Sequence, residues 1–373
     1  MFRDCHPERS AQHVVEGSGN AVLQVQNLSV AFGFDKNGKP REGITPLQVT
    51  DKVSFEINQG EFFALVGESG CGKSVTAMSI LRLLPQPSAQ IVEGSVLYRA
   101  GENAAPVDLA KLPLAELQKV RGSEIACIFQ EPMQALNPVV TIKKQLLEVF
   151  KFCGIKGDLL ATIREMLTLA GFKDIDRVLD SYPHELSGGM LQRVCIVMAL
   201  LSKPKLIIAD EPTTALDVTV QAQVLAVLKD MANRTGTAVL LITHNMGIVS
   251  QYADRVAVMY AGRIVETGSV RDVIDSPMHP YTQGLLAAIP ENHSDMRTMK
   301  SIPGSVPHPR DFAKGCRFAD RCEKCTEQCL SDELPPRVMA SNSTSHEAFC
   351  FAKYNTTRIV QSLRSCTKCS LRS

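Results

Sequence analysis

The stretch GESGCGKS at residues 67–74 constrains the fold of this chain more than any other feature. It matches the phosphate-binding pattern G-x-x-x-x-G-K-[ST], which needs a strand before it and a helix after it. Residues 62–66 are all apolar, as in a buried parallel strand, and residues 75–84 carry apolar side chains at helical spacing. A chance glycine-rich turn would lack these neighbours, so the sequence predicts a phosphate loop within an α/β domain.

The residue types of this loop indicate its chemistry. Its glycines permit a tight turn that aims backbone N–H groups at phosphate oxygens, and the following helix adds its positive dipole. Lys73 would reach the outer phosphates, and the Ser74 hydroxyl would hold Mg²⁺. We therefore expect a nucleotide to contact Gly67, Glu68, Ser69, Gly70, Cys71, Gly72, Lys73, Ser74 and Val75.

The composition is that of an ordinary globular protein. The 373 residues carry a net charge of +1, so they create no strong field for nucleic acid. No apolar run approaches the roughly eighteen residues that cross a bilayer, and residues 1–20 lack the apolar core of a signal peptide. We expect a chain in the cytosol or on the cytosolic side of a membrane, without a nucleic-acid partner.

Three further apolar segments end at polar residues suited to phosphate chemistry: 125–129 at Gln130, 206–209 at Asp210 and Glu211, and 238–243 at His244. Strands that alternate with helices predict a mainly parallel sheet covered on both faces. Ligands bind at the carboxyl ends of strands in such sheets. We therefore expect these side chains to gather beside the phosphate loop.

Each of these polar residues has an expected role. Asp210 would hold Mg²⁺ with Ser74, and Gln130 could touch both Mg²⁺ and the attacking water. Glu211 is placed to polarise that water for in-line attack on a γ-phosphate, which His244 could hydrogen-bond. Any one of them alone more often belongs to an ordinary loop. Together with the phosphate loop they predict a catalytic set of Lys73, Gln130, Glu211 and His244.

A second anion-ready helix start lies at residues 186–190, LSGGM, which we call the signature segment. It comes far after the phosphate loop and need not face the same nucleotide. The ordered set of the phosphate loop, Gln130, the signature segment, Asp210-Glu211, ALD at 215–217 and His244 resembles the ATP-binding cassette (ABC) transporter ATPases. The resemblance covers roughly residues 21–290.

This resemblance implies that two nucleotide-binding domains pair head to tail. Each ATP would lie between the phosphate loop of one chain and the signature segment of the other. Ser187, Gly188 and Gly189 would then contact the partner's ATP, and Asp217 would lie at the dimer contact. Phe32 resembles the aromatic residue that stacks on adenine, although Phe34 competes for that role.

The resemblance also implies a domain organisation. The fold would be an ABC-type P-loop NTPase at residues 21–290, with a RecA-like core, an antiparallel β subdomain and a helical signature subdomain at about 131–190. Residues 1–20 would form an N-terminal arm. Residues 291–373 would form a small cysteine-rich extension with a basic tail from residue 353.

Finer matches narrow the family. YPHELSGGM at 182–190, ADEPTTALDVT at 209–219 and HPYTQGLL at 279–286 look like the ATPases of dipeptide/oligopeptide importers. Met190 resembles the "D" member of that ATPase pair, so the partner would be an "F"-type ATPase. The assembly would include two membrane permease subunits and an extracytoplasmic peptide-binding protein. Residues 131–138 of this chain resemble the segment that contacts the permease. The chain would sit peripherally on the cytoplasmic face of the inner membrane.

The C-terminal cysteines resemble the extension of that family, in which some members bind a four-iron four-sulfur cluster. The implied ligands are Cys316, Cys322, Cys329 and Cys350. Thiolates suit iron–sulfur clusters. A zinc site that uses Cys322 and Cys325, reduced thiols without metal, and thiols paired under oxidation remain alternatives.

The function implied by the resemblance is ATP hydrolysis that energises the import of di- or oligopeptides. A soluble ABC ATPase acting on DNA or ribosomes is an alternative, but such proteins usually carry tandem ATPase domains, coiled coils or basic patches. An importer ATPase for another solute, such as a nickel chelate, is a second alternative. A degenerate half without catalysis is disfavoured by the presence of Lys73, Gln130, Glu211 and His244.

Overall fold

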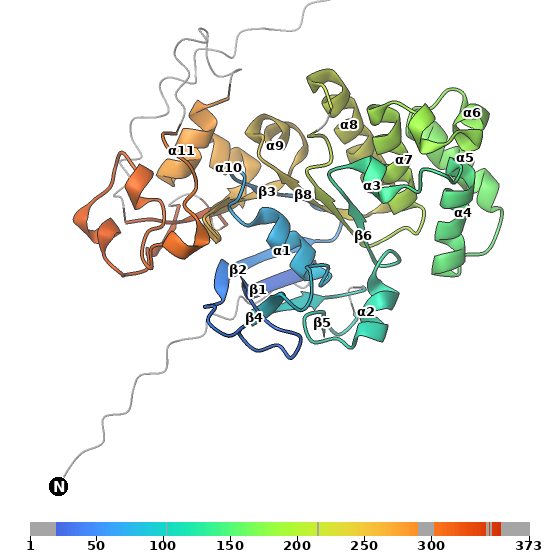
Figure 1. The fold of residues 1–373 in the computed structure, drawn as a ribbon. Coiled ribbons are helices and arrows are strands. Elements are labelled where there is room, and N and C mark those ends of the chain that lie inside the picture. Colours follow the sequence, from blue (N-terminus) through green and yellow to red (C-terminus); the bar gives the residue numbers. More distant parts are fainter. Residues whose placement is uncertain are drawn as a thin grey trace, which may run out of the picture.

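The computed structural model describes two sheets and their helices (Figure 1). The described residues are 20–101, 103–214, 216–289, 302–340, 343 and 345–351. Residues 1–19 of the predicted arm, the basic tail from residue 353 and Ala215 lie outside this set. Within the described residues, no helix combines the length and the apolarity that a membrane span requires.

The larger sheet has eight strands in the order β11-β12-β10-β9-β3-β8-β7-β6. Its parallel members are β9 (Arg255–Tyr260), β3 (Phe62–Val66), β8 (Ala238–Thr243), β7 (Leu206–Asp210) and β6 (Ile125–Ile128). Every residue of β3, β7 and β8 is buried, as expected for parallel strands covered on both faces. The predicted parallel sheet is therefore confirmed.

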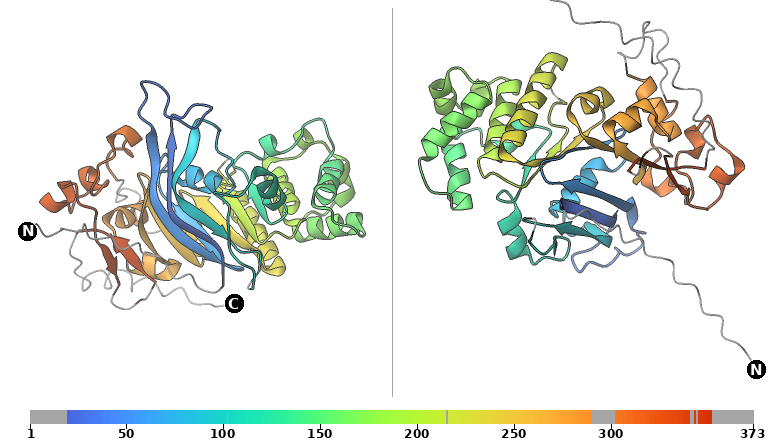
Figure 2. Two further views of the ribbon diagram at one scale, coloured as in Figure 1. Left: turned by 90° about the horizontal axis from the view of Figure 1, so that it is seen from below. Right: turned by 180° about the vertical axis from the view of Figure 1, so that it is seen from behind.

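A smaller antiparallel sheet packs across one face of the larger one. Its strands are β2 (Leu47–Asn58), β1 (Ala21–Phe32), β4 (Ala89–Tyr98) and β5 (Val107–Asp108), in that order. Helix α1 (Lys73–Ile80) lies between the two sheets (Figure 1). The left view of Figure 2 shows the long strands of the smaller sheet. Phe63 and Leu65 join the apolar core on this side, whereas Ala64 and Val66 face the opposite side.

Helix α1 is shorter than the helix predicted from residues 75–84, because the chain turns sharply after Ile80. Arg82 adopts a left-handed conformation with a φ of 52°. The Leu83 N–H reaches back to the Met78 carbonyl at 2.8 Å, as in a helix-ending Schellman turn. The apolar spacing continues past this point, so it could not reveal the end of the helix.

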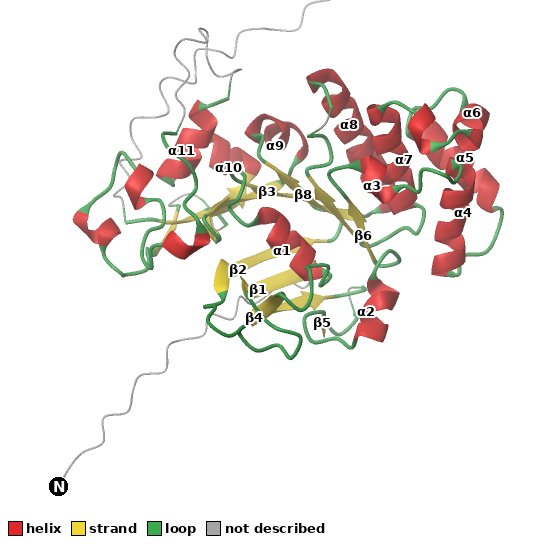
Figure 3. Cartoon of the chain, in the orientation of Figure 1, coloured by secondary structure: helices red, strands yellow, loops and turns green. Residues whose placement is uncertain are grey.

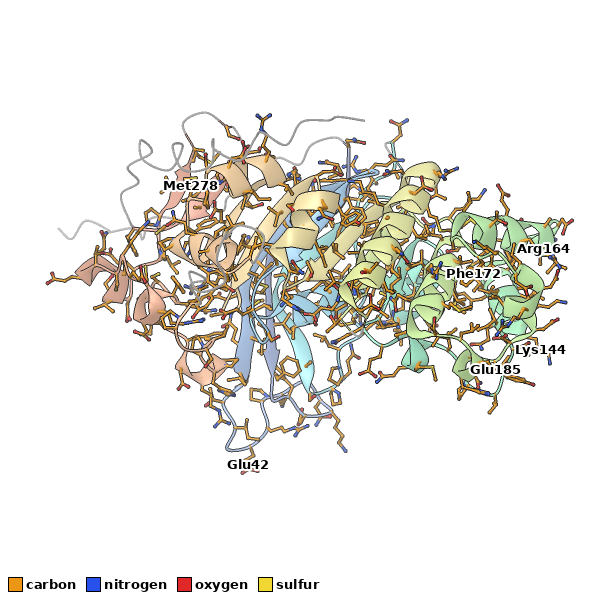
Figure 4. The ribbon with its side chains drawn as sticks, turned by 90° about the horizontal axis from the view of Figure 1, so that it is seen from above. Glu42, Lys144, Arg164, Phe172, Glu185 and Met278 are labelled. Carbon is orange, nitrogen blue, oxygen red and sulfur yellow. The ribbon has the colours of Figure 1, made fainter. Side chains whose placement is uncertain are left out.

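Helices dominate the segment between β6 and β7 (Figure 3). They are α3 (Pro132–Ala135), α4 (Ile142–Cys153), α5 (Leu159–Leu169), α6 (Ile175–Asp180) and α7 (Gly188–Leu200). Figure 4 places Lys144, Arg164, Phe172 and Glu185 in this part of the molecule, far from Met278. The remaining helices are α2 (Leu114–Val120), α8 (Val218–Thr235), α9 (Met246–Tyr252), α10 (Val270–Asp275) and α11 (Pro280–Ala287).

The C-terminal segment, by which we mean the described residues from 302 to 351, joins the edge of the larger sheet. Strand β12 (Glu347–Phe349) pairs with β10 (Arg263–Ser269), and β11 (Arg337–Met339) pairs with β12. Phe318 packs edge-on against Tyr260, with ring centroids 5.1 Å apart, in the same core as α9 and α11.

The fully buried carboxylate of Glu266 anchors the C-terminal segment through hydrogen bonds. Its carboxylate accepts the N–H of Met278 at 2.7 Å and the N–H of His279 at 2.8 Å. His346 Nε2 lies 2.8 Å from the same carboxylate, and both side chains are almost completely buried. One buried acceptor thus joins β10, the start of α11 and the C-terminal segment.

Replacing Glu266 by Ala should destabilise the protein by about 3 kcal/mol or more, because it strands two buried N–H groups and one imidazole. Urea denaturation followed by circular dichroism measures the change. The variant E266Q keeps one acceptor oxygen and the shape, so its loss should be smaller. An E266A variant within about 0.5 kcal/mol of the wild type would contradict this account.

Candidate functional site

The phosphate loop runs from the end of β3 into α1. A Cβ atom on Gly67 would lie 2.2 Å from the Met259 carbonyl oxygen, so only glycine fits there. Gly72, which precedes α1, has a φ of 106° and a Cβ position 2.9 Å from the Met259 side chain. The glycines of the motif are therefore required by the closeness of β9 as well as by the turn.

Lys73 is the first residue of α1, and its buried side chain folds back over the phosphate loop. Its ammonium donates to the carbonyl oxygens of Gly67 at 2.8 Å and Glu68 at 3.0 Å. It also lies 3.9 Å from the carboxylate of Glu211. These contacts aim the cation of α1 at the mouth of the loop and at the end of β7.

The Ser74 hydroxyl and the Asp210 carboxylate lie together near the Lys73 ammonium. The Ser74 hydroxyl donates to the Asp210 carboxylate at 3.0 Å. Burial raises the pKa of Asp210, and the hydrogen bond from Ser74 opposes that shift. A carboxylate and a hydroxyl are hard oxygen donors of the kind that Mg²⁺ prefers, and a bound cation would offset the desolvation of the carboxylate.

Glu211 follows β7 and is held from several sides. Its carboxylate accepts the Thr214 hydroxyl at 2.9 Å and lies 3.4 Å from His244 Nδ1. The backbone φ of Glu211 is 45°, an uncommon value for a residue with a side chain. The parallel register of β7 and β8 brings this carboxylate to His244.

The remaining predicted site residues are Gln130 and the two candidates for stacking on adenine, Phe32 and Phe34. Gln130 is exposed after β6, and in the described part of the chain it makes no hydrogen bond to the other members of the set. Phe32, at the end of β1, is partly exposed, whereas Phe34 is 7% exposed and buried. Of the two aromatic residues, Phe32 therefore offers the more accessible ring.

The signature segment opens α7. The Ser187 hydroxyl accepts the Met190 N–H at 3.4 Å, and a Cβ atom on Gly189 would lie 2.6 Å from Val220 of α8. Ser187 is exposed and Gly189 is buried. Asp217 caps α8 by accepting the Val220 N–H at 3.0 Å.

The phosphate loop and the signature segment belong to opposite faces of the larger sheet. Ile208 of β7 packs in the core that contains α1, whereas Ile207 packs in the core that contains α7. Figure 1 shows α1 below the sheet and α7 above it. The sheet therefore separates the two anion-ready helix starts within one chain.

The described C-terminal cysteines lie in the C-terminal segment, on the side of the molecule opposite α4, α5 and α6 (Figure 1). Cys316, Cys329 and Cys350 are buried, Cys322 is partly buried and Cys325 is exposed. The pKa of Cys316 is raised to about 12, chiefly by burial and further by Cys329, Cys350 and Cys322 nearby. Soft thiol donors suit an iron–sulfur cluster. Within the described residues, however, no three His, Cys, Asp or Glu side chains are arranged to hold a metal ion.

Comparisons with known proteins identify the family. Residues 50–214 match the model of the ABC transporter family, and residues 265–329 match that of the oligopeptide/dipeptide transporter C-terminal region. The chain is 44% identical to the oligopeptide transport ATP-binding protein AppD of Bacillus subtilis, over 84% of this chain and 92% of AppD. The chain belongs to the oligopeptide/dipeptide ABC ATPases. As a member of this family it hydrolyses ATP.

Further relatives agree. The dipeptide transport ATP-binding protein DppD of Bacillus subtilis is 43% identical over 88% of this ABC ATPase and 94% of DppD. A solved structure described as the dimeric, post-hydrolysis state of the ATP-binding cassette MJ0796 with ADP and Pi is 25% identical. It covers 67% of this chain and 99% of its own, with a TM-score of 0.55. The predicted ABC ATPase fold is therefore confirmed.

Two contacts to the phosphate loop of this ABC ATPase were not predicted. The Glu68 N–H donates to the Tyr281 hydroxyl at 2.8 Å, and the Glu68 carboxylate is paired with Arg321. Both partners lie within residues 265–329, which match the oligopeptide/dipeptide transporter C-terminal region. No local pattern could show that these segments reach the loop, because more than 200 residues separate each pair.

The thiol of Cys71 within the phosphate loop should resist alkylation in the folded protein. Burial raises its pKa to about 11, so roughly one molecule in a thousand carries the reactive thiolate at pH 8. Iodoacetamide at pH 8 should label exposed Cys325 and spare Cys71 until urea is added, as measured by peptide mass spectrometry. Equal labelling of the two thiols in folded protein would contradict the burial of Cys71.

Proposed function

We propose that this ABC ATPase energises the import of di- and oligopeptides through separate permease subunits at the cytoplasmic face of the inner membrane. The observation that carries this proposal is the match of residues 265–329 to the oligopeptide/dipeptide transporter C-terminal region. Relatives that align along most of the chain bear the names of oligopeptide and dipeptide transport proteins. These names favour peptides over a nickel chelate, and they disfavour a role on DNA or ribosomes.

The surface near the helical part supports a membrane partner. The large apolar side chains exposed there include Phe129, Met133, Val139, Phe152 and Tyr182. Exposed apolar side chains that cluster on a protein surface mark sites of protein–protein contact. We assign residues 131–138 and their surroundings to the contact with a permease subunit.

The chain provides one half of each of two nucleotide sites. The helices that follow the phosphate loop and the signature segment pack in cores on opposite faces of the sheet, which favours their use in two different sites. We infer that a second ATPase chain of the "F" type completes each site head to tail. Ser187, Gly188 and Gly189 would then serve the partner's nucleotide, and Asp217 would lie at the dimer contact.

Hydrolysis would use the groups gathered at the ends of β3, β7 and β8. Lys73 would exchange the carbonyls of Gly67 and Glu68 for phosphate oxygens, and Ser74 and Asp210 would hold Mg²⁺, which supplies charge compensation on the phosphates. Glu211 would accept a proton from the attacking water. His244, 3.4 Å from Glu211, would donate to the γ-phosphate, and Gln130 would orient the water.

Proteoliposomes that contain the two permeases, this chain and its sister ATPase test the transport proposal. Labelled peptide, delivered by the binding protein, should accumulate only with ATP present. A nickel chelate offered in the same assay should not accumulate. ATP-dependent uptake of the chelate, without uptake of peptides, would overturn the assignment of the solute.

The variant Glu211→Gln should lower ATP hydrolysis by the assembled complex at least about 100-fold, because the amide cannot accept the proton from water. Binding of ATP should persist, since Glu211 does not belong to the phosphate loop. Glu148→Gln makes the same chemical change on exposed α4 and serves as the matched control. Hydrolysis retained in E211Q would show that another group is the base.

We further propose that Cys316, Cys322, Cys329 and Cys350 bind a four-iron four-sulfur cluster. The supporting observations are the resemblance of these cysteines to the family's extension and the burial of Cys316, Cys329 and Cys350. Because no three of the described side chains are arranged to hold a metal, cluster binding would require the thiols to move together. Anaerobically purified protein should show broad visible absorption and about four irons per chain. Colourless, iron-free protein, with or without bound zinc, would overturn this proposal.

A further inference from the structure

Arg321 reaches from the C-terminal segment into the phosphate loop. Its guanidinium meets both oxygens of the Glu68 carboxylate, at 2.7 Å and 2.9 Å. The Arg321 side chain is 7% exposed, and that of Glu68 is 30% exposed. This two-point pairing is the geometry in which arginine binds a carboxylate most firmly.

The remaining donors of Arg321 are held by the surrounding protein. Its Nε donates to the Pro303 carbonyl at 2.8 Å, and its guanidinium lies 5.6 Å from the ring centre of Tyr260. The Tyr260 ring packs at a tilt against that of Tyr281, whose hydroxyl accepts the Glu68 N–H. Both the side chain and the backbone of Glu68 are thus held by residues outside the loop.

The charge of Glu68 makes this arrangement more than a packing contact. A phosphate loop binds an anion with several negative charges, and a free carboxylate within the loop would repel it. Arg321 compensates that charge, and it does so from a segment that supplies no other side chain to the loop in the described residues. Removing the guanidinium would leave an unpaired acid beside incoming phosphates.

We propose that Arg321 is a positioning residue for ATP binding, which neutralises Glu68 and fixes the phosphate loop from the C-terminal segment. The short helical turn Ala319–Arg321 that carries it lies between Cys316 and Cys322. The charge compensation of Glu68 therefore comes from this cysteine-rich turn. The inference rests on ATP binding by the phosphate loop and not on peptide as the solute.

The test is a double-mutant cycle on the full-length chain with a fluorescent ATP analogue. Arg321→Gln should weaken binding about tenfold, by leaving Glu68 unpaired, and the effect should shrink as salt is raised. The double variant E68Q/R321Q has no unpaired charge, so it should bind the analogue more tightly than R321Q does. Thermal unfolding and circular dichroism verify that each variant is folded.

Arg317→Gln provides the matched control. Arg317 also ties the C-terminal segment to the core, through Asp51 at 2.7 Å, but it does not touch Glu68. This variant should lower the unfolding temperature while leaving ATP affinity near that of the wild type. The proposal is overturned if R321Q binds ATP normally, if the double variant binds as weakly as R321Q, or if R317Q weakens binding equally.

Discussion

Backbone hydrogen bonds between β3, β8 and β7 bring the chemical groups of this ATPase to one edge of the larger sheet. Because these strands are parallel, the phosphate loop, Glu211 and His244 all follow carboxyl ends that lie side by side. The contacts of Lys73 with Glu211 and of Ser74 with Asp210 are consequences of that register. A slip of one residue in β7 would turn Asp210 away from Ser74.

The larger sheet also bears on why the ATPase pairs with a second chain. Its two faces carry separate cores, one around α1 and one around α7. The phosphate loop leads into α1 of the first core, and the signature segment opens α7 of the second, so the two segments belong to opposite faces of the sheet. Pairing with a second chain is the arrangement that uses both, and closure on ATP would then transmit force to attached permeases.

The sequence was sufficient to predict the parallel strands, the phosphate loop and the polar residues at the carboxyl ends of the strands, because each depends on local apolar patterns and on strand order. It could not predict the end of α1 at Ile80, since the left-handed turn at Arg82 leaves no mark in the apolar spacing. Nor could it predict that Arg321 pairs with Glu68. That contact depends on how a distant segment docks, through aromatic packing and buried hydrogen bonds that have no periodic pattern.

ATP turnover by the isolated chain, compared with turnover after the sister ATPase and permeases are added, tests the central claim most directly. The isolated monomer should bind ATP and hydrolyse it slowly, and turnover should rise when the second chain supplies its signature segment. Fast hydrolysis by the isolated chain, with a rate per molecule that does not depend on protein concentration, would contradict the shared site.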